Sequence, residues 1–336
     1  VKNQHQVIVK AAPGAGKSTY FPLQLLLNHS VAGKIIMLEP RRLAARNIAR
    51  YLAEQLGEQV GQRVGYRVRG EAKVSSATQL EIVTEGIMTR MIQTDPELDG
   101  VDLLIFDEFH ERNLHSEVGL ALSREIQEIL RPDLRILLMS ATIDTRSLSQ
   151  MLSAKVIESK GRQFPVEIDY LGEIDSYDLG GDTARQVSKI VKTTQGDVLV
   201  FLPGQGEIKK AEKQLKASLP DFNICPLYGS LPFSAQQKAI LPDTNGKRKI
   251  VLSTDIAETS LTIEGVRVVV DSGYSKTSKF DPKTGLSRLV LQRISQDSAD
   301  QRSGRAGRLE SGKAFRLWTK ATHANLQEFR TPELLE

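Results

Sequence analysis

The sequence predicts an α/β protein with two similar domains in tandem, each a mainly parallel sheet with helices on both faces. Three observations predict this class. Short β-type runs alternate with helical runs along the chain, which is the pattern of parallel sheets joined by crossover helices. The strand candidates of the first half are nearly continuous apolar runs, as expected for strands covered on both faces. A length of 336 residues is enough for two domains that each bury a core.

In the first half of the chain, strands are predicted at residues 7–9, 34–39, 79–84, 103–106 and 135–139. Residues 41–56 and 116–130 carry apolar or small side chains at helical spacing, and Gly57 closes the first of these helices. Pro22 falls inside the helix expected after the first strand. We expect a local bend there, because proline has no N–H to donate to the helix.

A second αβ series occupies the other half, with strands predicted at residues 166–170, 198–202, 223–227, 249–253 and 266–270 and helices at 184–192 and 207–218. Two extended runs, 274–279 and 286–293, flank a Pro/Gly turn and predict a β-hairpin. Residues 171–182, acidic and rich in glycine, predict a surface loop. The polar segment 159–163 is the best boundary, so we expect domains at residues 1–160 and 161–320. Residues 321–336 are then expected to be the start of a truncated C-terminal region.

The composition, 40% hydrophobic and 26% charged, is that of a soluble globular protein. No apolar run approaches the length of about 18 residues that spans a bilayer, so we expect no membrane partner. The single cysteine, Cys225, excludes an internal disulfide and favours a cytoplasmic protein. The net charge of +4 permits an anionic partner without identifying one.

A phosphate-binding loop is predicted after the first strand, where residues 11–19 read AAPGAGKST, with Ala11 at the position of the usual first glycine. Glycine lets backbone N–H groups approach phosphate oxygens, and the following helix start adds partial positive charge. Lys17 would reach the β- and γ-phosphates, and the Ser18 hydroxyl would bind Mg²⁺. The alternative is a solvated Gly/Lys turn. The loop predicts a nucleoside triphosphate site formed by Gly14, Ala15, Gly16, Lys17, Ser18 and Thr19.

An acidic turn follows the strand predicted at residues 103–106, where the chain reads Asp107, Glu108, Phe109 and His110. Ligands of parallel sheets gather at the carboxyl ends of the strands. Asp107 can therefore hold Mg²⁺ opposite Ser18, and Glu108 can polarise the attacking water. The alternative is a turn with solvated acids.

These residues, DEFH, resemble motif II of the DEAH-box helicases of superfamily 2, with Phe109 in place of the usual alanine. Other segments match the remaining family motifs in their order along the chain: Ia at 39–45, Ib at 83–86, III at 140–142, IV at 201–204, IVa at 228–232, V at 254–263 and VI at 301–308. The strings DEFHER (107–112) and LEPRRLAAR (38–46) are most similar to the bacterial HrpB-type members. The resemblance implies two tandem RecA-like P-loop NTPase domains with the nucleotide in the cleft between them.

Arg305 and Arg308 lie three residues apart, so on a helix they share one face and can converge on one anion. An arginine supplied by a second domain can stabilise charge on a transferring phosphoryl group. The alternative is a basic surface helix. The resemblance implies that Gln301 helps Glu108 to position the water and that Asp255 or Thr254 senses the nucleotide.

The predicted nucleic-acid contacts are mainly to the backbone. Arg41 and Arg42 lie at a helix start, where side-chain cations and N–H groups can share phosphates. The resemblance implies that a single strand is also held by Thr84, Thr142, Gly204 and Thr254. A lone threonine is otherwise more readily interpreted as a turn or cap residue. The predicted hairpin resembles the family's strand-separating hairpin, although a solvated edge hairpin fits the same pattern.

Tyr51 and Leu241 fall where relatives stack the nucleotide base between two side chains. Stacking would not read the edges of the base, so other NTPs besides ATP are expected to be accepted. A packing tyrosine, partly exposed, is the alternative for Tyr51.

The resemblance thus implies an NTP-driven motor, in the first place an ATP- and Mg²⁺-dependent RNA helicase acting on single-stranded RNA or on a duplex with a single-stranded tail. We expect a monomer, and a protein activator is left open. Three alternatives stay open: a DNA-directed helicase, an NTP-dependent RNA clamp or assembly factor without unwinding activity, and a P-loop transferase. The arginine pair and the doubled αβ series argue against the transferase.

Overall fold

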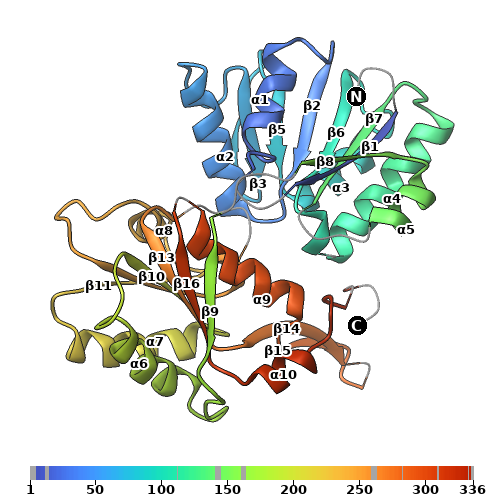
Figure 1. Cartoon of the computed structure of the whole chain (residues 1–336). Coiled ribbons are helices and arrows are strands. Elements are labelled where there is room, and N and C mark those ends of the chain that lie inside the picture. The colour runs from blue at the N-terminus through green and yellow to red at the C-terminus, as the bar shows by residue number, and fades with distance from the viewer. Residues whose placement is uncertain are drawn as a thin grey trace. The chain divides into compact units, whose positions relative to one another are not determined.

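The computed structural model describes residues 5–11, 15–111, 113–140, 145–159, 164–258, 263–281, 283–308, 310–331 and 333, with only the backbone of 145–147. The chain divides into two compact units (Figure 1). The first comprises Val1–Arg162 together with Thr331–Leu335, and the second comprises Gln163–Arg330. Each unit contains one large sheet with helices packed against it, as the sequence predicted.

The sheet of the first unit has the strand order β4-β3-β5-β2-β6-β7-β1-β8 among the described residues. Its neighbouring strands are parallel except for the short edge pair β3 and β4. The strands are β1 (Gln6–Ala11), β2 (Lys34–Leu38), β3 (Val64–Val68), β4 (Glu71–Lys73), β5 (Leu80–Val83), β6 (Val101–Phe106), β7 (Arg135–Ser140) and β8 (Lys155–Ser159).

Helices cover both faces of this sheet, which explains why its central strands are apolar throughout. Ile36 and Leu38 of β2 face the core formed with α3, α4 and α5. Helices α1 and α2 lie on the opposite face (Figure 1). The helices are α1 (Tyr20–Leu27), α2 (Arg42–Gln55), α3 (Glu85–Thr94), the short η1 (Phe109–Glu111), α4 (Leu114–Ile129) and α5 (Thr145–Leu152).

Pro22 does not interrupt the interior of α1, because the helix begins only at Tyr20. Proline is tolerated in the first turn of a helix, where backbone N–H groups have no partner within the helix. The turn that precedes α1 is closed instead by the Phe21 N–H, which donates to the Gly16 carbonyl at 3.0 Å.

The sheet of the second unit has the order β11-β12-β10-β13-β16-β9, and the pairs formed by its described strands are parallel. Helices α6 and α7 pack on one face, and α9 lies on the other (Figure 1). The strands are β9 (Val166–Tyr170), β10 (Asp197–Phe201), β11 (Asn223–Leu227), β12 (Lys249–Ser253), β13 (Val266–Asp271) and β16 (Gly312–Arg316). The helices are α6 (Leu179–Ile190), α7 (Gln205–Ser218), α8 (Phe233–Ile240), η2 (Asp255–Ala257), α9 (Gln296–Ser303), η3 (Gly304–Gly307) and α10 (Lys320–Ala324).

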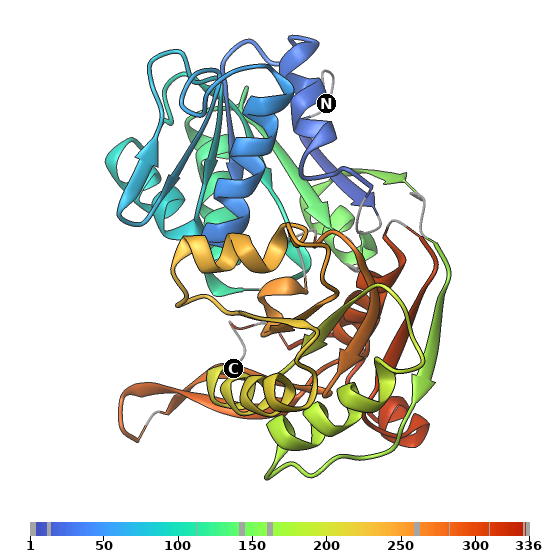
Figure 2. The same cartoon turned by 90° about the vertical axis from the view of Figure 1, so that its left-hand side faces the viewer.

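The predicted hairpin is present as β14 (Tyr274–Asp281) and β15 (Leu286–Arg293), an antiparallel pair separate from the large sheet. Figure 2 shows it as the orange ribbon that projects from its unit. Its outer half exposes three apolar side chains, Phe280, Leu286 and Leu289.

The predicted loop at residues 171–182 is wrong at its end, because Leu179–Asp182 form the first turn of α6. The Asp178 side chain caps this helix by accepting from the Gly181 N–H at 2.9 Å. Gly180 is required by packing, since a Cβ there would lie 2.6 Å from the Glu207 carbonyl oxygen of α7. One of the glycines that suggested a loop, Gly180, therefore serves a close contact between two helices.

No helix in the described part of the chain is both long and apolar enough to cross a membrane.

Candidate functional site

The predicted phosphate loop joins β1 to α1 in the first unit. Gly14 lies outside the described residues, whereas Ala15, Gly16, Ser18 and Thr19 form a partly exposed turn. Gly16 has a φ of +78°, and a Cβ there would lie 3.0 Å from the Tyr20 Cβ. Since a side chain would be strained in this conformation, the second glycine of the pattern is required by the backbone.

The Lys17 ammonium group is buried between two carboxylates of the acidic turn. Its Nζ lies 2.6 Å from Glu108 Oε2 and 3.9 Å from Asp107 Oδ1. Burial alone would lower the pKa of Lys17, but the Glu108 and Asp107 carboxylates offset this, so that the pKa is raised above its usual value. The phosphate loop thus carries a permanent cation close to the end of β6.

Asp107 has the surroundings of a cation ligand. The neighbouring Ser18 side chain lowers the pKa of its carboxyl group. Its Oδ2 atom is buried and accepts no hydrogen bond from the described residues. Burial and then the neighbouring Glu108 carboxylate raise the pKa of Asp107 to about 7. A divalent cation would satisfy the buried oxygen and favour the ionised carboxylate, and Ser18 and Asp107 supply the oxygen ligands that Mg²⁺ prefers.

Glu108 adopts a backbone conformation that is rare for a residue with a side chain, with a φ of +50°. Its N–H donates to Asp107 Oδ1 at 2.8 Å, and its Oε2 lies 3.5 Å from His110 Nδ1. A left-handed conformation of this kind destabilises the folded protein by about 1–3 kcal/mol, and such residues occur often at functional sites. The conformation directs the Glu108 carboxylate toward Lys17, a feature that the sequence did not indicate.

Glu39 was not singled out as a site residue by the sequence analysis, although it is fully buried beside the acidic turn. It directly follows β2. Since Leu38 of β2 pairs with Phe106 of β6, the next residues along the two strands, Glu39 and Asp107, lie next to each other. Burial, followed by the Asp107 and Glu108 carboxylates, raises the pKa of Glu39 well above its usual value. An acidic residue directly after an apolar strand was the available signal, the same one that indicated Asp107.

Arg41 and Arg42, predicted to contact nucleic acid, lie where α2 begins. The Arg41 guanidinium is 3.3 Å from Glu111 Oε1, and the Arg41 N–H donates to Glu39 Oε1 at 3.2 Å. Arg42 is exposed and donates to the Arg69 carbonyl at 2.7 Å. Arg41 is therefore connected to the acidic turn, whereas Arg42 faces solvent.

The other predicted nucleic-acid residues also lie where a strand passes into a helix. Thr84 lies between β5 and α3, Gly204 between β10 and α7, and Thr254 between β12 and η2. In the first unit β2 and β5 are neighbours, so Arg41 and Thr84 lie at adjacent strand ends. In the second unit β10 and β12 are neighbours, so Gly204 and Thr254 also lie at adjacent strand ends. Thr142 lies outside the described residues.

The Thr254 hydroxyl accepts from the Ile256 N–H at 3.5 Å and caps η2, so the capping role weighed from the sequence is present at this residue. A capping hydroxyl can still accept or donate a further bond to a phosphate or ribose.

The predicted arginine pair lies at the end of α9 in the second unit. Arg305 belongs to η3, and Arg308 follows directly; both line one small cavity with Ala257 and Ile263. Residues three apart align on a 3₁₀ helix, so the two side chains share one face as predicted. The Arg305 guanidinium donates to the Glu258 carbonyl. Gln301 is buried on α9, and Asp255 opens η2.

Tyr51 on α2 and Leu241 at the end of α8 are both exposed, with 48% and 54% of their surface accessible. Each is therefore accessible in its own unit for stacking on a planar ligand. For Tyr51 this exposure also agrees with the alternative of a partly exposed packing tyrosine.

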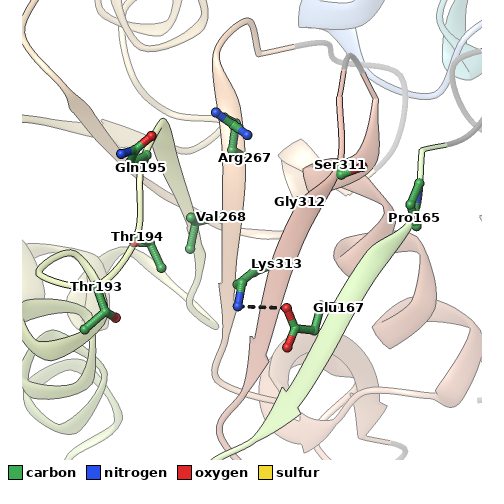
Figure 3. A pocket seen from close by; sticks show the side chains of 10 residues that line it. All are labelled: Pro165, Glu167, Thr193, Thr194, Gln195, Arg267, Val268, Ser311, Gly312 and Lys313. Carbon is green, nitrogen blue, oxygen red and sulfur yellow. Dashed lines mark ion pairs between the residues drawn. The ribbon is translucent and has the colours of Figure 1, made fainter.

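The second unit has a further depression at the opposite edge of its sheet, where β9, β13 and β16 begin (Figure 3). Its volume is about 350 Å³. Lys313 crosses it to pair with Glu167 at 2.7 Å, while Arg267 pairs with Glu310 at 3.1 Å. This depression contains none of the residues predicted to bind nucleotide or nucleic acid.

Lys17, Ser18 and Asp107 meet at the carboxyl end of a parallel sheet, as in P-loop NTPases, and the second unit repeats such a sheet. The fold is that of two tandem RecA-like domains with an added hairpin. Residues 1–151 match the family described as DEAD/DEAH box helicase, and residues 182–310 match the helicase conserved C-terminal domain. The chain therefore belongs to the DEAD/DEAH box helicases.

The comparisons with individual proteins agree with this family. The crystal structure of the Escherichia coli DEAH/RHA helicase HrpB superposes with a TM-score of 0.92 at 51% identity, covering 98% of this chain and 42% of that one. The ATP-dependent RNA helicase HrpB of E. coli K12 is 51% identical over 333 residues, 98% of this chain and 41% of HrpB. The Haemophilus influenzae ATP-dependent RNA helicase HrpA homolog is 38% identical, over 99% of this chain and 26% of that protein. The chain thus spans less than half the length of these relatives.

Proposed function

We propose that this chain hydrolyses ATP with Mg²⁺ and uses the hydrolysis to move along and unwind RNA. The observation that carries the proposal is the buried cluster of Lys17, Asp107 and Glu108 at a phosphate loop. The family and the names of the two relatives support the same activity. Domains at residues 1–160 and 161–320 remain our proposed division of the chain.

In this proposal Lys17 exchanges partners when the nucleotide binds. The lysine is held by Glu108 at 2.6 Å and would turn from that carboxylate to the β- and γ-phosphates. Glu108 is then released to orient a water molecule and to take its proton. Lys17 thus acts twice, first holding Glu108 in place and then binding the substrate.

Ser18 and Asp107 would hold Mg²⁺, and the buried, unsatisfied Asp107 Oδ2 supports this assignment. When bound, the ion would neutralise charge on the phosphates. Gly14, Ala15, Gly16 and Thr19 would supply backbone N–H groups to the same phosphates.

We assign Arg305 and Arg308 to the charge that develops on the transferring phosphoryl group. Such arginines typically raise the rate of hydrolysis by about 10³–10⁵-fold. Their shared cavity supports a common target. Gln301 would help to position the water, and Asp255 would sense the nucleotide. The base would stack on Tyr51 and Leu241 without being read at its edges, which allows other NTPs.

RNA would be held through its backbone by Arg41, Arg42, Thr84, Thr142, Gly204 and Thr254. The position of the described members of this set at helix starts supports phosphate contacts, since free N–H groups point outward there. We propose single-stranded RNA, or a duplex with a single-stranded tail, as the substrate of a monomer. A DNA-directed helicase and an NTP-dependent clamp or assembly factor are the remaining alternatives, and a protein activator is left open.

The test is NTP hydrolysis by the purified chain with and without poly-RNA and poly-DNA, followed by unwinding of a tailed duplex. RNA-stimulated hydrolysis with unwinding is expected. Stimulation by DNA alone would favour the DNA-directed alternative, and RNA stimulation without unwinding would favour the clamp. A folded protein that fails to hydrolyse any NTP would overturn the proposal.

A further inference from the structure

A buried arginine that is not expected to contact phosphate lies at the centre of the second unit. Arg302 of α9 is 1% exposed. Its Nε donates to Glu258 Oε2 at 2.8 Å, and its remaining contacts go to Asp271 Oδ1 at 3.0 Å and to the Tyr274 carbonyl at 3.3 Å. Its guanidinium also stacks on the Phe201 ring. One side chain thus joins α9 to η2, to the end of β13, and to the first residue of the hairpin.

The charge of Arg302 is held by two carboxylates of its own unit. Burial opposes the charge of Arg302, yet the Asp271 and Glu258 carboxylates hold its pKa above its usual value. Two carboxylates therefore satisfy the guanidinium inside the unit. The guanidinium therefore links several elements of the second unit.

Glu258, one of the two carboxylate partners of Arg302, makes further contacts. Its carboxylate accepts from Arg302 through Oε2 and from the Ser298 hydroxyl through Oε1, at 2.6 Å, so that it holds α9 at two points. Its backbone carbonyl accepts from Arg305. Glu258 therefore contacts α9, the helix that leads directly into η3 and the proposed catalytic arginines, and also contacts Arg305 itself.

Glu258 is also rigidly connected to a proposed RNA contact. It ends the single turn η2, which Thr254 begins, and its N–H donates to the Asp255 carbonyl at 2.9 Å. The Thr254 hydroxyl closes the other end of the same turn. A displacement of Thr254 is thus passed through one hydrogen-bonded turn to Glu258.

We propose that Glu258, held by Arg302, is a positioning residue that couples RNA at Thr254 to the placement of Arg305. The inference rests on the proposed function, because it assumes RNA-stimulated hydrolysis. RNA bound at Thr254 fixes η2, Glu258 then fixes α9 through its two carboxylate bonds, and Arg305 is held ready for the phosphoryl group. The Arg302 contact to Tyr274 extends the same connection to the base of the hairpin.

Removing Arg302 is a poor test, because a buried carboxylate would lose its partner and the unit would be destabilised. Glu258→Gln is milder. The amide keeps the size of the side chain and one acceptor, the backbone bond to Arg305 is unaffected, and Arg302 retains Asp271. Glu167→Gln is the matched control, since it removes one carboxylate charge from the same unit at the opposite edge of the sheet (Figure 3).

The experiment measures ATP hydrolysis against RNA concentration for the wild-type chain, Glu258→Gln and Glu167→Gln, with RNA affinity from fluorescence anisotropy and melting temperature as further readouts. We expect Glu258→Gln to lose about tenfold in RNA stimulation, a usual size for coupling between two sites. Its basal kcat, its KM for ATP and its RNA affinity should stay within about twofold of wild type, a difference worth only about 0.4 kcal/mol. Glu167→Gln should behave as wild type in every assay.

Equal losses of basal and RNA-stimulated rate in Glu258→Gln would mean a merely structural role and would overturn the inference. So would stimulation equal to that of the wild type, which leaves the proposed function intact. If the wild-type chain itself shows no RNA stimulation, the proposed function fails, and the coupling fails with it.

Discussion

Glu108→Gln should separate nucleotide binding from hydrolysis. In the structure Glu108 accepts the Lys17 ammonium group at 2.6 Å, and Asp107 lies 3.9 Å from the same nitrogen. Glutamine keeps the shape of the side chain and one hydrogen-bond acceptor for Lys17. It cannot take a proton from water, because its amide is not basic.

The expected magnitudes follow from these distances. Lys17 and Asp107, about 4 Å apart, retain a gross attraction of about 4 kcal/mol at an effective dielectric constant near 20. Lys17 therefore stays charged in the variant, and Asp107 and Ser18 remain available for Mg²⁺, so nucleotide affinity should change by less than about threefold. Loss of a general base typically lowers the rate by about 10²–10⁴. This corresponds to about 3–5 kcal/mol in the barrier.

The assay combines steady-state phosphate release with equilibrium binding of a fluorescent ATP analogue. Glu128→Gln is the matched control in the same unit, because Glu128 makes only an exposed pair with Arg124. A parallel loss of binding and turnover in Glu108→Gln would refute the reasoning and would make Glu108 a ligand of the metal or nucleotide. Turnover equal to that of the control would remove Glu108 from the chemistry altogether.

The remaining predictions concern the other site residues. Lys17→Ala should abolish ATP hydrolysis, measured as phosphate release, because it removes the cation for the β- and γ-phosphates; wild-type turnover in a folded variant would exclude the phosphate loop. Arg305→Ala and Arg308→Ala should each lower kcat by about 10³-fold or more with little change in nucleotide affinity, and a rise in KM that accounts for the whole loss would indicate uniform binding instead. RNA affinity, measured by titration at several salt concentrations, should fall with salt and show little sequence preference. Arg41→Ala should reduce the slope of RNA affinity against salt concentration by about one phosphate contact. An unchanged slope would mean that Arg41 makes no contact with the RNA backbone.

Much of the fold was predictable because the signals for it are local. Strands β9, β11, β12 and β15 were predicted to the residue, since each is a short β-type run in the sequence. Strands β3, β4, β8 and β16 were missed, and they are less apolar: β3 contains Gly65 and Arg67, β4 is the short run Glu71–Lys73, and β8 is an exposed edge strand. Their pairing partners make them strands, and such partners are not visible in a local pattern.

The phosphate loop and the acidic turn were also predictable, because their chemistry is encoded in adjacent residues. Gly16 shows this, since its positive φ is a property of the turn itself. The interpretation of Gly180 failed for the opposite reason. Gly180 is required by its close contact with the Glu207 carbonyl on another helix. A sequence pattern cannot distinguish a glycine required by packing from a glycine that makes a loop flexible.

From the sequence alone, a lysine, a hydroxyl and two carboxylates could be predicted to form an NTP site. Which of these groups touch could not be predicted in this way, because it depends on the order of strands in the sheet. Lys17 and Glu108 are 91 residues apart in sequence and form a buried pair. Glu39 lies beside Asp107 because β2 pairs with β6, and Glu258 binds Arg302 because the end of η2 lies beside α9. Strand order is set by packing over the whole domain, so these contacts have no signature in any short stretch of the chain.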